Sequence, residues 1–143
     1  MKSQKVVLSV SGTVQGEEDE SIRLMTTGVL SGGEPHWKLR YKETLPDGEM
    51  SQHITVSMDD GVVTMNRDGM FATAMVFEKG HRFEGSYNTP FGSIEMGVFP
   101  TRVHYHVYEG VGEVDLQYQL DLKGQFEAMH ELSIRFAPGG PES

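Results

Sequence analysis

Two residues of opposite charge, Glu43 and Arg67, fall at positions that the sequence assigns to apolar strand faces. Side chains along a strand point alternately to its two faces. Glu43 therefore shares a face with Trp37 and Tyr41, and Arg67 shares a face with Met65. Because a lone buried charge is very costly, these two side chains must pair, lie solvated at strand ends, or bind a ligand.

Further polar side chains fall on apolar faces by the same parity: Thr26, Tyr87, Tyr118 and His130. A guanidinium can hold a carboxylate through two parallel hydrogen bonds. We therefore expect Arg67, with Tyr118 or Thr26, to hold an anionic head group at the polar end of an apolar cavity. The apolar part would be lined by Trp37, Met65, Phe77, Leu116 and Leu132.

The ligand-binding candidates are accordingly Glu43, Arg67, Tyr118, Thr26, Trp37 and Met65. The alternative is that Glu43 and Arg67 are solvated or pair only with each other. A buried tyrosine or histidine usually finds one backbone partner and has no further role.

His104 and His106 lie two residues apart on one strand face, with Glu109 nearby, a spacing that could ligate a metal. Their face alternates with that of Val103 and Tyr105, so we expect it to be the solvated one. The sequence identifies no third ligand, and we expect neither a metal site nor a cofactor.

No recognised catalytic motif occurs in the chain, neither a nucleophile elbow nor a phosphate-binding loop, dinucleotide fingerprint or zinc-protease motif. The absence of cysteine excludes thiol nucleophiles and zinc–thiolate sites. We identify no catalytic residues, and the sequence favours binding over catalysis.

The formal net charge is −9, with 12 basic residues scattered among 21 acidic ones. Binding to nucleic acid or to an anionic membrane needs clustered lysine and arginine, so neither partner is expected. The chain shows no secretory signal and no apolar run long enough to span a membrane. Together with the lack of cysteine, this predicts a cytoplasmic protein.

Apolar and polar residues alternate along most of the chain, which is typical of strands with one dry face. Val114, Leu116 and Tyr118 form the clearest such run, and residues 69–79 are also predicted as a strand. Residues 92–109 are either one strand bent at Pro100 or two short strands. Turns are predicted at 16–20, 31–33, 46–48, 59–61, 67–69, 79–80, 90–92 and 110–112.

Short strands joined by short turns predict an all-β, antiparallel, up-and-down barrel of about 8–10 strands, because closure removes the exposed edges of an open sheet. A two-sheet sandwich would need longer crossovers. One domain is expected over residues 1–143, with a frayed tail at 138–143 that cannot join a sheet.

Several motifs, in the same order, resemble the YwiB-like family of uncharacterised bacterial proteins. They are Met25-Thr26-Thr27-Gly28, Leu39-Arg40-Tyr41-Lys42-Glu43, Gly61-Val62-Val63-Thr64-Met65-Asn66-Arg67-Asp68-Gly69, Tyr87-Asn88-Thr89-Pro90-Phe91-Gly92 and the run from Val114 to Leu120. The resemblance implies a lipocalin-like (calycin) barrel and a bacterial cytosolic origin. It implies no catalytic residues.

The function expected from the sequence is binding of a small apolar or amphipathic anionic ligand inside the barrel. The alternative is a filled barrel without a ligand that acts through its outer surface as a structural or protein-interaction module. A homodimer is compatible with either.

Overall fold

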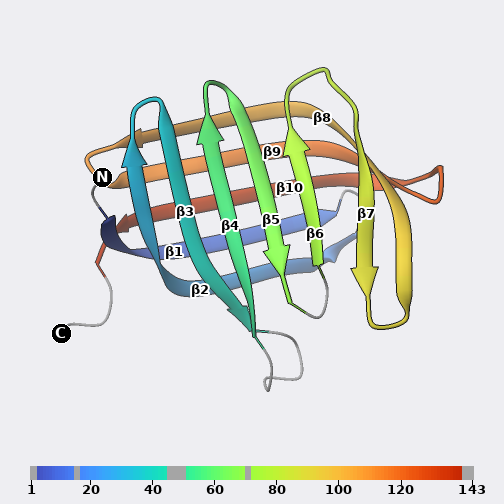
Figure 1. Ribbon diagram of the computed structural model, residues 1–143, viewed down its shortest axis with the longest axis horizontal. Helices are drawn as coiled ribbons and strands as arrows, with labels where there is room; N and C mark the ends of the chain where they lie inside the picture. The colour runs from blue at the N-terminus through green and yellow to red at the C-terminus, as the bar shows by residue number, and fades with distance from the viewer. Residues whose placement is uncertain (1–2, 15–16, 45–50, 70–71, 140–143) are drawn as a thin grey trace.

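Ten antiparallel strands, each hydrogen-bonded to its neighbours in the chain, close into a barrel when β10 pairs with β1 (Figure 1). The computed structural model describes residues 3–14, 17–44, 51–69 and 72–139, without the side chains of residues 17–22, 44, 51, 126 and 127. The strands are β1 (Ser3–Val14), β2 (Glu17–Gly33), β3 (His36–Thr44), β4 (Ser51–Asp59), β5 (Val62–Asp68), β6 (Ala72–Phe77), β7 (Phe83–Thr89), β8 (Gly92–Tyr108), β9 (Val111–Leu122) and β10 (Gln125–Pro138). The predicted all-β antiparallel barrel is confirmed.

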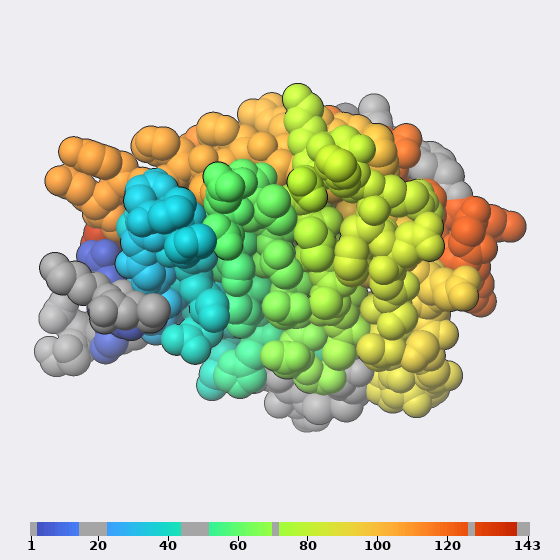
Figure 2. Space-filling view, turned by 45° about the horizontal axis from the view of Figure 1, so that its top comes forward, coloured from blue at the N-terminus to red at the C-terminus, as the bar shows by residue number. Residues whose placement is uncertain are grey.

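The barrel is flattened into two layers whose strands cross at a steep angle (Figure 1). Strands β3 to β7 form one layer, whose outer surface is continuous in the space-filling view (Figure 2). Strands β1, β2, β9 and β10 form the other. β8 is one long strand, bent where its register on β9 shifts between Pro100 and Arg102, so the single-strand alternative for residues 92–109 holds.

The interior between the layers is filled by apolar side chains, which alternate with polar ones along the strands. Leu116 and Tyr118 both point inward, as the period of two predicts, and so do Leu39 and Tyr41 on the opposite layer. The ring centroids of Phe77 and Tyr118 lie 5.0 Å apart within this core. The centre of the barrel is therefore packed with side chains.

Three predicted boundaries are wrong. The turn expected at 31–33 lies instead at Glu34 and Pro35, because residues 31–33 still pair with β3. Residues 17–20 begin β2 instead of forming a turn, since Val14 already pairs with Glu17. Pro138 pairs with Val6 and the Gly139 N–H donates to the Lys5 carbonyl, so the start of the predicted tail extends the sheet. The predicted turn at 46–48 and residues 15–16, 70–71 and 140–143 lie outside the described residues.

The β2–β3 pairing ends at Gly28, opposite Tyr41. A Cβ atom at Gly28 would lie 2.4 Å from the Arg40 carbonyl oxygen, which is far too close. Only glycine lets the two backbones approach here. Beyond this point the two strands separate, because the earlier part of β2 pairs with β1 alone.

Candidate functional site

A polar cluster occupies the inner face of the barrel at the end where β3 finishes and β4 begins. The Arg67 Nε donates to Glu43 Oε1 at 3.1 Å and Arg67 Nη2 donates to Glu43 Oε2 at 3.4 Å. The fully buried Gln52 adds a contact of 3.4 Å from its Nε2 to Glu43 Oε1. The side chains of Arg67 and Glu43 are 25% and 30% exposed, so the pair faces the open end of the barrel.

Two buried tyrosines carry their phenols close to this pair. Burial raises the pKa of Tyr41 to about 12, against the lowering effect of the nearby Arg67 charge. Burial also raises the pKa of Tyr118, and Arg67 again acts in the opposite direction. Both phenols are therefore protonated donors at neutral pH, and neither donates to another described residue.

His130 and Thr73 extend the polar lining on either side. The imidazole of His130 stacks on the Tyr118 ring with centroids 5.4 Å apart, and burial lowers its pKa. The buried Thr73 hydroxyl donates to the Ser86 carbonyl at 3.3 Å. Neutral imidazole, hydroxyl and phenol groups thus accompany the Glu43–Arg67 pair.

The six sequence-predicted site residues do not all come together. Glu43, Arg67 and Tyr118 gather at one end, and Met65 lies buried two residues before Arg67 on β5. Thr26 is half-buried on β2, beside the gap that opens after Gly28. Trp37 is six residues before Glu43 on β3, about 20 Å away at the rise of a strand.

Trp37 lines a separate cleft of about 520 Å³ at the opposite end, with Leu30, Gln4 and Glu109. Its indole Nε1 is buried without a hydrogen-bond partner among the described residues. Arg67 lines a cleft of about 280 Å³ between β6 and β7, two strands that are joined by two residue pairs among the described residues. Arg67 and Thr73 line this second cleft, whereas Glu43 and the two tyrosines do not.

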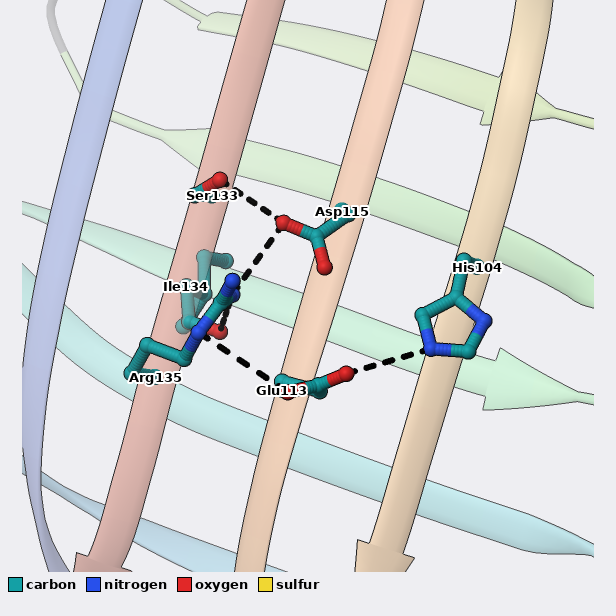
Figure 3. A network of polar contacts seen from close by, with 6 residues as sticks. All are labelled: His104, Glu113, Asp115, Ser133, Ile134 and Arg135. Atoms are coloured by element: carbon teal, nitrogen blue, oxygen red, sulfur yellow. Dashed lines mark hydrogen bonds and ion pairs between the residues drawn. The ribbon is translucent and has the colours of Figure 1, made fainter.

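The outer face of β8, β9 and β10 carries a second polar network (Figure 3). His104 Nε2 lies 3.2 Å from Glu113 Oε2, and Arg135 Nη1 donates to Asp115 Oδ1 at 3.1 Å. Ser133 donates to the same Asp115 oxygen at 2.8 Å. The pKa of Asp115 lies below its ordinary value. Burial raises this pKa, but the hydrogen bonds from Ser133 and Arg135 lower it by more.

This network supplies the neighbours of His104 that the sequence could not identify. Ligand atoms of His104, Glu113 and Asp115 lie within 4.8 Å of one another. Arg135, however, pairs with both carboxylates, at 3.9 Å from Glu113 and 3.1 Å from Asp115. Its positive charge opposes a divalent cation at this position, so we assign the group an electrostatic role in joining the three strands.

Sequence reasoning missed two inward polar residues near the ion pair. Gln52 shares the face of Ile54 and Val56, and Thr73 shares the face of Met75, so parity alone could have found both. Tyr41 was placed on the inner face, but its proximity to Arg67 depends on strand order and register.

Comparisons with known proteins agree with this architecture. The model of a domain of unknown function, DUF1934, matches residues 8–134. The crystal structure of the ywiB protein from Bacillus subtilis is similar, with a TM-score of 0.84 and 20% identity over 96% of this chain and 94% of that chain. At this identity the likeness by itself shows the fold alone. Together with the DUF1934 match over most of the chain, it confirms the resemblance to the YwiB-like family. No curated protein matches the chain.

Among the described residues there is no helix with the length and apolar character needed to cross a membrane.

Proposed function

Because this chain belongs to the DUF1934 family, whose description assigns no activity, we propose a function from the site alone: the barrel binds a small amphipathic anion at its polar end. The observation that carries the proposal is the set of hydrogen-bond donors gathered there. Arg67 and the phenols of Tyr41 and Tyr118 lie at the edge of an apolar interior.

The pairing of Arg67 with Glu43 leaves donors available. A guanidinium has five N–H groups, and Glu43 accepts from one N–H on Nε and one on Nη2. Three N–H groups and two phenols thus favour a head group that only accepts hydrogen bonds, such as a carboxylate. Met65, Phe77 and the Tyr118 ring provide apolar surface beside it.

The packed middle of the barrel limits where the ligand can lie. Phe77 is fully buried between the layers, so a long apolar chain cannot thread the whole lumen without moving it. The same packing favours the second candidate, a filled barrel that acts through its outer surface. The two candidates differ in whether any small molecule reaches Tyr118.

The test is titration with a fluorescent long-chain carboxylate and with its neutral methyl ester. The double substitution Glu43→Gln with Arg67→Met removes both charges, so no unpaired charge is left inside. Loss of charge-assisted hydrogen bonds should weaken carboxylate binding by about tenfold or more, while ester binding changes by less than about twofold.

Arg135→Met is the matched control, because Arg135 also pairs with carboxylates but lies on the outer face. It should leave both affinities unchanged. Equal loss of carboxylate and ester binding in the double variant would mean that the ion pair only supports the fold. No uptake of either probe by the native chain would favour the outer-surface candidate, as would native mass spectrometry without any co-purifying small molecule.

A further inference from the structure

A cleft of about 520 Å³ opens on the outside of the barrel where β2 and β3 separate. It begins at the Gly28–Tyr41 pair, the last one joining these two strands. Its floor includes Tyr41 and the fully buried Ile54, and its walls come from β1, β2, β3 and β4. The cleft is a consequence of β2 continuing along β1 while β3 turns away with β4.

Every charged side chain that lines this cleft is basic or imidazole: Lys5, Arg40, Lys42 and His53. None of the four makes a side-chain hydrogen bond or ion pair with a described residue. By contrast, Arg67, Arg82 and Arg135 each pair with a carboxylate. A basic cluster that no described carboxylate compensates, in a chain of net charge −9, requires an explanation other than overall solubility.

Strand register brings the four side chains to one place. Lys5 pairs with Val29, and Val29 pairs with Arg40, so the two cations flank one valine on the outer face. Neighbouring strands lie about 4.8 Å apart, which puts the backbones of Lys5 and Arg40 about 10 Å apart, a span that both long side chains can close. Lys42 and His53 form the next outward pair.

We propose that this cleft binds a small molecule bearing a phosphate group. A phosphate carries two charges and several acceptor oxygens, which matches three cations together with the hydroxyls of Thr27 and Thr55 in the lining. Val29 and Ile54 offer apolar contact for the remainder of the molecule. The cations of this site are separate from Arg67 of the interior site, because Arg40 and Lys42 point to the opposite face of β3 from Glu43. Tyr41 lies between the two sites and forms part of the floor of the cleft.

A polymeric polyanion fits less well. A nucleic acid needs a track of positive charge along its backbone, whereas Asp68 lies beside His53 in the next strand and limits the basic region on that side. The net charge of −9 also repels an extended polyanion at long range.

The experiment is titration of the full chain with pyrophosphate, followed by two-dimensional amide NMR. Shifts should concentrate at residues 27–29, 40–42 and 53–55. The double substitution Arg40→Gln with Lys42→Gln should weaken binding by about tenfold or more, because two charge-assisted contacts are lost. Both residues are exposed, so the barrel should still fold, and circular dichroism checks this.

Lys38→Gln is the matched control: the residue lies on the same outer face of β3, is exposed and does not line the cleft. It should change pyrophosphate affinity by less than about twofold. The proposal would be overturned if the amide shifts did not fall on residues of the cleft. It would also be overturned if Lys38→Gln weakened pyrophosphate binding as much as the double substitution does. Tighter binding of a single-stranded oligonucleotide than of pyrophosphate would overturn the small-molecule class. The interior variant Glu43→Gln with Arg67→Met should bind pyrophosphate normally, and its failure to do so would refute a separate site.

Discussion

Glu43 on β3 and Arg67 on β5 meet across the intervening strand β4, through two contacts of 3.1 and 3.4 Å. Neither residue is opposite the other in a strand pair: Glu43 faces Gln52 and Arg67 faces Ile54. The ion pair is therefore diagonal and joins three strands at the open end of the barrel. It is also the boundary between the apolar interior and the solvent.

The first prediction concerns this pair. Glu43→Gln or Arg67→Met alone leaves one half-buried charge without its partner and should lower the free energy of unfolding by about 1–3 kcal/mol. The double substitution should cost less than the sum of the two singles, because no unpaired charge remains. Urea denaturation of the four proteins measures the coupling energy, and strict additivity would show that the pair contributes nothing.

The second prediction concerns the strand crossing at Gly28. Gly28→Ala puts a Cβ atom 2.4 Å from the Arg40 carbonyl oxygen and 3.0 Å from a Leu8 methyl, so the backbones must move apart. The expected loss of unfolding free energy is about 1–3 kcal/mol. Gly33→Ala on the same strand is the control, since nothing lies within 4 Å of its Cβ position. Equal stabilities of the two variants would disprove the close approach.

A third prediction tests the packed middle of the barrel. Phe77 is fully buried against Tyr118, so Phe77→Ala should destabilise by about 3–5 kcal/mol. Phe91 is 95% exposed, and Phe91→Ala should change stability by no more than about 0.5 kcal/mol. Thermal or urea unfolding measures the stability of both variants. A loss of stability at Phe77→Ala as small as that at Phe91→Ala would indicate a hollow interior.

The fourth prediction is a pH dependence at the alkaline side. Burial raises the pKa of Tyr41 to about 12, above the value near 10 of an unfolded tyrosine. The folded state thus opposes ionisation, and this part of the stability is complete below about pH 10 and lost as the pH rises through about 12. Ultraviolet absorbance of tyrosinate should show Tyr41 and Tyr118 ionising at a higher pH than an unfolded tyrosine does.

Tyr41→Phe provides the control for that titration, because it removes the phenolic hydroxyl and leaves the aromatic ring. The variant should lose part of the late component of the absorbance change and part of the alkaline loss of stability. If the absorbance change of the native chain has no component above the ordinary pKa of tyrosine, the enclosed position of Tyr41 is wrong.

The period of two was sufficient to predict the barrel and the inward orientation of Glu43, Arg67 and Tyr118. Each orientation depends only on neighbours within the same strand, which the sequence contains. The start of β2 was predicted as a turn, because an acidic run is typical of a solvated turn. A strand with one solvated face accepts charged residues as well. Only the pairing of Val14 with Glu17 shows that the hairpin continues.

What the sequence could not supply is register between strands. Lys5 and Arg40 are separated by many residues along the chain, and they meet because β2 passes between β1 and β3 with Val29 in line. His104 meets Asp115 for the same reason, through the β8–β9 register. Trp37 shares the inner face of β3 with Glu43, but parity carries no information on which end of the barrel a residue occupies.

The most direct test of ligand binding at the polar end is an isotope-filtered NMR experiment on the native chain with a saturated medium-chain fatty acid. The account predicts intermolecular contacts from the carboxylate end of the chain to the Tyr118 ring protons and to the Met65 methyl group. A spectrum in which the fatty acid contacts only outward-facing side chains, or none, would contradict it.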